Sequence, residues 1–294
     1  MARARAALRG LAVGDALGSQ YFVPVNLLLL ARSEVPEGPW QWTDDTEMAC
    51  SVVAVLAGHG AIDEDVLARS FALHQDFDRG YGAAAGRLLR QVREGGDWRE
   101  LAAALFDGRG SYGNGAAMRI APLGAWYAGD PERAAHEAAL SARPTHHHPE
   151  AVAGAVAVAV AASLLADGGG RWDGVWLLRA VLPWVAPGEV RRGLEQAVEL
   201  LGRDDPAAVA AVLGCGRQVS AQDTVPFALW SVAIGGGDFA GTFWRTALAG
   251  GDVDTTCAIA CGVAAAGGAV PPAAWREQTE PLPGWVPERV PGAV

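Results

Sequence analysis

The sequence predicts an all-α fold, and three observations support this prediction. Apolar residues recur at spacings of three and four over long segments, which places them on one face of a helix. Alanine dominates most of these segments and favours helix, whereas glycine and proline cluster between them. Segments that alternate apolar and polar residues between turn residues, as strands do, are scarce.

The periodic segments mark the predicted helices. In the first of them, residues 50–73, Val53 and Leu56 lie on the same face. Six further segments follow it: residues 83–92, 133–142, 151–166, 176–185, 190–201 and 256–266. Pro183 is expected to kink or end its segment, because proline lacks the amide hydrogen that a helix interior needs. The tail, residues 271–294, is rich in proline, carries two tryptophans and is predicted to wrap the surface without regular structure.

The chain is expected to form one domain, residues 1–294, since no linker, charge run or change of composition divides it. Hydrophobic residues make up 51% of the chain, which is enough for a large core. The most apolar run, residues 151–166, is shorter than the ~20 residues that a membrane span needs, so a buried helix and no membrane partner are expected. The N-terminus lacks the apolar core of a secretory signal, and a cytoplasmic location is therefore expected.

The charge and the residue content exclude several classes of function. A net charge of -10 argues against a nucleic-acid surface and suits a site that recruits cations. The sequence contains no lysine, which excludes Schiff-base chemistry and the lysine-dependent P-loop and kinase mechanisms. The four cysteines show no CxxC spacing, and Cys257 and Cys261, one helical turn apart, are interpreted as small core residues.

Two acidic clusters give the strongest functional signal. Each contains two aspartates beside a threonine and precedes an apolar helical stretch: Thr43, Asp44 and Asp45 in the first, Asp252, Asp254 and Thr255 in the second. Either cluster alone could be a helix cap. Together the four carboxylates would balance the charge of two divalent cations, and oxygen donors without His or Cys select hard cations such as Mg²⁺, Mn²⁺ or Ca²⁺. The two clusters are therefore predicted to meet in the folded chain.

Two glycine-rich segments precede or occupy predicted helices. Residues 110–119 would let backbone N–H groups approach an anion at a helix start, although an ordinary Asn-Gly turn explains the same residues. Gly10, Gly14 and Gly18 recur at helical spacing, which usually means close packing of two helices.

A histidine run and an acidic loop leave two interpretations each. His146, His147 and His148 have no companion His or Cys at zinc-ligand spacing, so a solvated loop is the commonest outcome and a bond from a His to a phosphate or ribose oxygen is the functional alternative. Asp78 lies beside a glycine-rich bend, either as a solvated charge at a helix end or as a general base or acceptor of a substrate hydroxyl.

With these motifs in order, the chain resembles the ADP-ribosylglycohydrolase family, from Gly10 to about Ala266. Any one motif is weak, and six in the family's order are specific. They are Gly14-Asp15-Ala16-Leu17-Gly18, Thr43-Asp44-Asp45-Thr46, Arg79-Gly80-Tyr81-Gly82, Gly113-Asn114-Gly115-Ala116-Ala117-Met118-Arg119, Thr145-His146 and Gly251-Asp252-Val253-Asp254-Thr255.

The resemblance implies a single compact, orthogonal helical domain with two Mg²⁺ or Mn²⁺ ions in a central cleft. It implies that the metal ligands are Thr43, Asp44, Asp45, Asp252, Asp254 and Thr255. It also places a set of residues against the diphosphate and adenosine, with Tyr112 stacked on adenine and His146 near the phosphates or ribose: Gly110, Ser111, Tyr112, Gly113 and Asn114. Asp78 falls where some relatives carry a catalytic carboxylate.

Two positions depart from the family pattern. Phe22 stands where many relatives carry a Glu thought to gate or assist catalysis, so either another carboxylate serves or the activity differs. Val253 stands where a Thr is common between the two aspartates, and this change is expected to matter less.

The predicted function is hydrolysis of the N- or O-glycosidic bond between ADP-ribose and a protein or small-molecule acceptor, with Asp44 or Asp78 as the base. One alternative is an ADP-ribose reader that lost catalysis with the missing Glu. Another is a hydrolase of a small ADP-ribose or nucleoside derivative. The sequence leaves the acceptor open, and a monomer is the expected state.

Overall fold

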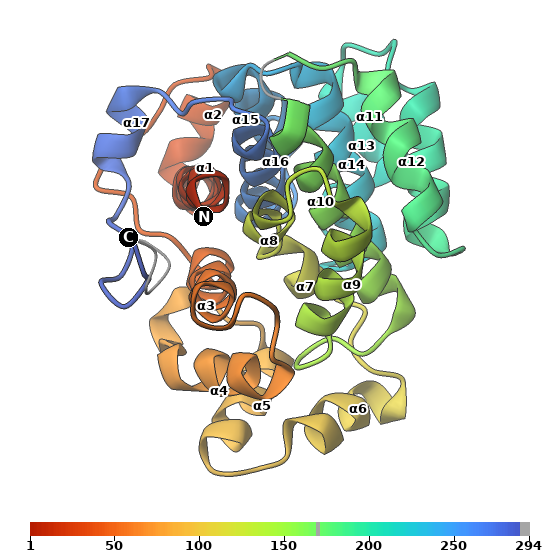
Figure 1. The fold of residues 1–294 in the computed structure, drawn as a ribbon. Coiled ribbons are helices and arrows are strands. Elements are labelled where there is room, and N and C mark those ends of the chain that lie inside the picture. The colour runs from red at the N-terminus through yellow and green to blue at the C-terminus, as the bar shows by residue number, and fades with distance from the viewer. Residues whose placement is uncertain (169–170, 289–294) are drawn as a thin grey trace.

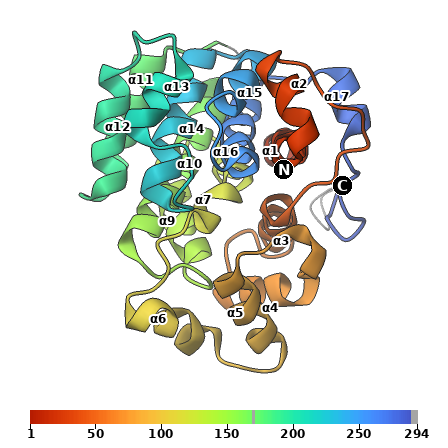
Figure 2. The ribbon, with the colours of Figure 1, turned by 180° about the vertical axis from the view of Figure 1, so that it is seen from behind.

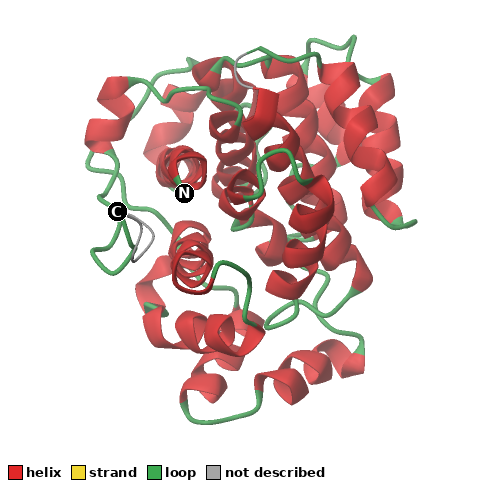
Figure 3. Ribbon diagram, viewed as in Figure 1, coloured by secondary structure: helices red, strands yellow, loops and turns green. Residues whose placement is uncertain are grey.

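The computed structural model describes residues 1–168 and 171–288, and helices dominate this part of the chain. No regular strand occurs within it; the only β pairing consists of the isolated bridges between Trp40 and Thr279 and between Gly113 and Ser220. Figure 3 shows helices joined by loops throughout. The all-α prediction is confirmed.

Helices α1 (Ala2–Ser19) and α16 (Val253–Ala266) pack side by side at the centre of the fold (Figure 1). The glycines of α1 make this approach possible: a Cβ atom at Gly14 would lie 2.5 Å from the backbone oxygen of Cys257, and one at Gly18 would lie 2.8 Å from the Cα atom of Asp254. The close packing predicted for these glycines is confirmed. It brings the N-terminus of α16 beside the C-terminal end of α1.

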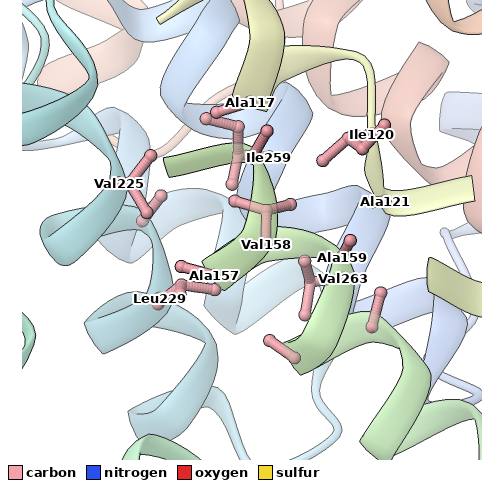
Figure 4. Packing of buried hydrophobic residues seen from close by; sticks show 14 of the residues in the cluster. Ala117, Ile120, Ala121, Ala157, Val158, Ala159, Val225, Leu229, Ile259 and Val263 are labelled. Atoms are coloured by element: carbon pink, nitrogen blue, oxygen red, sulfur yellow. The ribbon is translucent and has the colours of Figure 1, made fainter. Parts of the chain in front are cut away.

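Helix α10 (Pro149–Gly168) crosses the core. Its 20 residues make it, by length and composition alone, long and apolar enough to span a membrane, so the shorter length expected from residues 151–166 was wrong. The expectation of burial is confirmed, because 78% of its most apolar window lies inside the protein. In Figure 4, its residues Ala157, Val158 and Ala159 lie among side chains of α14 (Ala221–Gly235) and α16.

The other helices surround this core. They are α2 (Leu27–Ala31), α3 (Asp44–His59), α4 (Glu64–His74), α5 (Ala83–Arg93), α6 (Trp98–Gly108), α7 (Gly115–Met118), α8 (Ala121–Trp126), α9 (Pro131–Ala142), α11 (Gly174–Val181), α12 (Glu189–Glu199), α13 (Pro206–Leu213), α14 (Ala221–Gly235), α15 (Phe239–Ala247) and α17 (Ala273–Gln278). Short 3₁₀ turns occur at Gln20–Phe22, Pro24–Asn26, Phe77–Arg79 and Leu182–Trp184. Figure 2 shows α4, α5 and α6 gathered at one end of the molecule, below α3.

Two predicted helices end earlier than expected. The segment 50–73 is two helices, because α3 stops at Gly60, which has a φ of 74°, and α4 starts anew with Asp63 as its cap. The segment 176–185 leaves the α-helix after Val181, and Pro183 lies in the 3₁₀ turn that follows, as expected of a proline.

The prediction of an irregular tail is wrong for α17. Trp275 in this helix is buried against the aromatic rings of Phe239, Phe243 and Trp244, which gives the tail an apolar anchor. The tail is also joined to the chain near α3, since Trp40 N donates to Gln278 O at 2.6 Å. Residues 289–294 of the predicted tail lie outside the described residues.

Candidate active site

The two acidic clusters meet in one cavity of about 520 Å³. Asp44 and Asp45 lie in the first turn of α3, while Asp252 caps α16 and is followed in its first turn by Asp254 and Thr255. All five line the cavity, and the Thr255 hydroxyl lies 3.5 Å from Asp45 Oδ1, across 210 positions of sequence. The remaining lining residues are Met48 of α3 and residues from the loop after α4, from α5, from residues 106–118 and from positions 146, 218 and 219.

Asp15, to which the sequence analysis gave no role, holds the start of α3. Its fully buried carboxylate accepts hydrogen bonds from the backbone N–H and the hydroxyl of Thr43, at 3.0 and 2.8 Å, and from those of Thr46, at 3.1 and 2.5 Å. Thr43, a predicted metal ligand, therefore directs its hydroxyl at Asp15 and does not line the cavity. A lone acid among the small and apolar residues of α1 was the available signal for this role.

The cavity concentrates negative charge. Burial, reinforced by the neighbouring Asp15 carboxylate, raises the pKa of Asp44 to about 8. Burial also raises the pKa values of Asp45 and Asp254 well above the ordinary range, with Asp15 and Asp252 respectively as the next cause. No arginine is among the residues that line the cavity, and Asp45 Oδ2 is buried without a hydrogen-bond partner in the described part of the chain. The donor set thus fits a hard cation by its chemistry. Within residues 1–168 and 171–288, however, no group of three or more His, Cys, Asp or Glu side chains is arranged so that it could hold a metal ion.

These raised pKa values predict that the metal-free protein loses stability as the pH rises. Each carboxyl group prefers its proton more in the folded than in the unfolded chain, so its contribution is complete below the unfolded pKa, near 3.8, and is lost as the pH passes about 8 for Asp44. Urea unfolding of EDTA-treated protein should give a higher free energy of unfolding at about pH 6 than at about pH 9. The Asp45→Asn variant should show a smaller difference. Equal stability at both pH values in the wild type would contradict this electrostatic description.

A glycine-rich wall, residues 111–115, faces the acidic clusters. It is tied to the loop before α14 by the Gly113–Ser220 bridge and by a hydrogen bond from Asn114 N to Val219 O at 3.3 Å. Ser111, Tyr112, Gly113 and Asn114 line the cavity, whereas Gly110, also predicted as a contact, does not: it backs onto His147 and His148.

The Asn114 side chain is hydrogen-bonded to the second acidic cluster. Its amide nitrogen donates to Asp252 Oδ2 at 2.7 Å and to Thr224 Oγ1 at 3.1 Å. Both amide hydrogens are therefore engaged within the protein, and only the amide oxygen remains for a ligand. The Asn114 side chain therefore orients the Asp252 carboxylate.

Phe106 and Val219 line the cavity and were missed from the sequence. The Phe106 ring stacks near that of Tyr112, with centroids 6.2 Å apart and planes 29° apart. Phe106, Asp107 and Val219 adopt φ values of 52°, 59° and 51°, in the left-handed region that non-glycine residues rarely use. Such strained residues cluster at functional sites, but the residue types Phe, Asp and Val do not indicate a left-handed backbone in the sequence.

The loop after α4 places two glycines at the cavity and leaves Asp78 exposed to solvent. Gly80 and Gly82 line the cavity, while Asp78 is exposed and does not. Glu47 fixes this loop by accepting hydrogen bonds from the Tyr81 hydroxyl at 2.7 Å and from the Asp76 N–H at 3.1 Å. The structure therefore separates Asp78 from the four aspartates of the two clusters.

The histidine run divides into one cavity residue and two outer ones. His146 is buried, at 7% exposure, and lines the cavity, whereas His147 is exposed and His148 is half-buried. The expectation of a solvated loop is wrong for His146. Phe22, the departure from the family pattern, is 53% exposed and does not line the cavity.

The chain matches known proteins along almost its whole length. The model of the family described as ADP-ribosylglycohydrolase matches residues 1–291. Human ADP-ribosylhydrolase ARH3 is 35% identical over 189 residues, which are 57% of this chain and 51% of that protein, so the chain spans about half the length of the ARH3 relatives it matches. An uncharacterized protein of Archaeoglobus fulgidus is 30% identical over 93% of this chain and 90% of its own. A solved structure described as an ADP-ribosylglycohydrolase-related protein complex is 27% identical, with a TM-score of 0.65 over 94% of both chains.

Proposed function

The chain belongs to the ADP-ribosylglycohydrolase family, and from that premise we propose that it hydrolyses the glycosidic bond between ADP-ribose and an acceptor. In this reaction, the bond from the anomeric carbon of the ribose to the acceptor nitrogen or oxygen breaks. Water supplies the hydroxyl group that the anomeric carbon gains and the proton that the acceptor gains. The site leaves open whether the acceptor is a modified protein or a small molecule, and a cytoplasmic location is part of the proposal.

The observation that carries this proposal is the meeting of the helix starts of α3 and α16 at one cavity. Their carboxylates repel one another unless a positive charge is shared among them. We propose that two Mg²⁺ or Mn²⁺ ions supply it, and the cavity-lining residues available to hold them are Asp44, Asp45, Asp252, Asp254 and Thr255. Thr43, also predicted as a ligand, is left out because its hydroxyl is engaged by Asp15 and Asp45. When bound, such ions would offset the carboxylate charge and act as Lewis acids toward the ribose hydroxyls.

Two walls of the cavity offer N–H donors to a diphosphate. The first is the glycine-rich wall, where the N–H groups of Gly113 and Asn114 donate within the protein and those of Ser111, Tyr112 and Gly115 have no acceptor in the described structure. The second is the N-terminus of α5, where Gly82 provides no side-chain cap and the N–H groups of Ala83, Ala84 and Ala85 have no backbone partner in the described structure. These three residues line the cavity, so the unpaired N–H groups and the helix dipole favour an anion there.

Of the two candidate bases from the sequence, Asp44 is better placed than Asp78 to reach a bound substrate. It lines the cavity, and its Oδ1 atom lies 4.0 Å from the Cβ position of Gly80, so the absence of a side chain at residue 80 leaves room beside this carboxylate. A carboxylate placed there could take a proton from the attacking water. Asp78, which is outside the cavity, has no direct path to that water.

This assignment predicts different outcomes for two substitutions. Asp44→Asn should lower kcat at least about 100-fold, the lower bound for a lost general base, whereas Asp78→Ala should retain kcat within about threefold. Single-turnover assays with saturating ADP-ribosylated substrate compare the two, and circular dichroism confirms that both variants fold. A larger loss from Asp78→Ala than from Asp44→Asn would transfer the role of base to Asp78.

Phe106 and Tyr112 are proposed to hold the adenine ring. Base stacking on an aromatic side chain contributes about 1–3 kcal/mol, so Phe106→Ala should weaken ADP-ribose binding roughly 5- to 150-fold. It should weaken ribose 5-phosphate binding little, because that ligand has no base. Isothermal titration with both ligands measures the difference, and an equal loss for the two would argue against adenine at Phe106.

The proposed activity is tested by incubating the metal-loaded protein with ADP-ribosylated arginine, serine and nucleobase acceptors. Release of free ADP-ribose, followed by chromatography and absent in Asp44→Asn, is the expected result. The missing family Glu at Phe22 favours one alternative, a protein that binds ADP-ribose without cleaving it. ADP-ribose binding by calorimetry without release from any acceptor would select that alternative.

A further inference from the structure

Arg119 is a fully buried cation without a carboxylate partner among the described residues. It ends α7, and its guanidinium lies 4.5 Å from the ring centroid of Phe71. Its Nη2 atom donates to Ser141 O at 2.8 Å and to Thr145 Oγ1 at 3.0 Å. Burying a charge in this way is costly, and no ion pair in the described part of the chain compensates it. This cost points to a role for Arg119 in fixing the positions of the residues that it contacts.

Thr145 connects Arg119 to His146 by hydrogen bonds. An arginine can only donate, so Thr145 Oγ1 must accept the hydrogen bond from Arg119. The Thr145 hydroxyl is buried, and its other partner within the described residues is His146 Nδ1, at 2.7 Å. If Nδ1 carried a hydrogen, the hydroxyl hydrogen of Thr145 would be left without an acceptor inside the protein. Avoiding that penalty requires Nδ1 to accept and the ring hydrogen to lie on Nε2.

We infer that Arg119 and Thr145 are positioning residues that hold His146 in the tautomer with its hydrogen on Nε2, so that the ring presents an N–H donor to an anionic ligand in the cavity. The identification of that ligand as a phosphate or ribose oxygen of ADP-ribose rests on the proposed function. The tautomer itself rests only on the hydrogen-bond chain.

The surroundings of the ring agree with a neutral donor. Burial, with the nearby Arg119 charge as the second cause, lowers the pKa of His146 to about 3, so the tautomer decides what the ring presents. Nε2 makes no hydrogen bond to any described residue. A Cβ atom at Gly115 would lie 2.9 Å from Nε2, so glycine at this position leaves room around the donor.

The direct test is the nitrogen NMR spectrum of the whole chain labelled with ¹⁵N-histidine, with the His146 signals assigned by their loss in His146→Gln. The wild type and the conservative variant Thr145→Ser should both show hydrogen on Nε2 and a bare Nδ1. Thr145→Val, which removes the hydroxyl at nearly constant volume, should shift His146 toward the Nδ1–H form. Hydrogen on Nδ1 in the wild type would overturn the inference, whatever the two Thr145 variants show.

Calorimetric titration with ADP-ribose separates this inference from the proposed function. Thr145→Val is expected to bind about 10-fold more weakly than wild type, and Thr145→Ser within about twofold of it. His147→Gln, a change at the exposed neighbour, serves as the matched control and should bind as wild type does. If the wild type failed to bind ADP-ribose, the proposed function would be refuted. The nitrogen spectrum would still show which tautomer His146 adopts. If Thr145→Val bound as tightly as wild type, the positioning role would be refuted.

Discussion

Replacing Asp254 with alanine should lower turnover at least about 1000-fold, equivalent to about 4 kcal/mol of transition-state stabilisation. Asp254 lies in the first turn of α16, lines the cavity and has a pKa raised by burial and by Asp252. Without Asp254, a cation held by Asp44 and Asp45 of α3 would lose a carboxylate ligand from α16. Metal affinity and turnover should therefore fall together.

Turnover is measured with a metal-loaded protein, and Mn²⁺ affinity by titration of its paramagnetic signal. Asp204→Ala is the matched control, because Asp204 is an exposed aspartate outside the cavity. It should behave as wild type in both measurements. An Asp254→Ala variant with full turnover would refute the role given to the second cluster.

Replacing Gly14 with alanine should destabilise the protein by about 3 kcal/mol, at the upper end of what overpacking costs. The added Cβ would lie 2.5 Å from Cys257 O and 2.7 Å from Cys261 Cβ. Backbone cannot yield as a flexible side chain does, so α1 and α16 would have to separate. That separation would also displace the aspartates at the start of α16, and catalysis should decline with stability.

Gly58→Ala provides the opposite case with the same chemical change. Gly58 is exposed in α3, and nothing lies within 4 Å of its Cβ position, so alanine should raise stability by about 0.5 kcal/mol through its better helix propensity. Urea unfolding of both variants measures the contrast. Equal effects from the two substitutions would mean that the α1–α16 contact is not as close as described.

The sequence was sufficient for the parts of the molecule that repeat a simple rule. Helical periodicity and alanine content located α10 and most of α16, and the glycine spacing of α1 correctly indicated close packing. The buried helix α14 lay outside every predicted segment. The sequence failed where a local break overrides periodicity, as at Gly60, where a left-handed glycine ends α3 inside one apolar pattern. It also failed at α17, because the burial of Trp275 depends on aromatic residues of α15, more than 30 positions earlier.

The candidate site also contains residues that the sequence predicts and residues whose roles only the fold reveals. Residue chemistry alone indicated that the two acidic clusters belong together, since carboxylates beside a threonine at a helix start recur in both. The roles of Asp15, Asn114 and Phe106 depend on which groups the fold brings beside them. Asp15 is the only acid of α1, but its partners Thr43 and Thr46 are identified only when α3 is placed against it. Asp78 shows the converse, because its suggestive sequence neighbours lie on a loop that Glu47 holds with the acid facing solvent.

A crystal soaked in Mn²⁺ tests most directly whether the two helix starts form one cation site. The anomalous difference map should show manganese inside the cavity, between Asp45 on α3 and Asp254 on α16, and the Asp254→Ala crystal should lose that density. A map with no manganese at either cluster, from crystals shown to bind the ion elsewhere, would contradict the account.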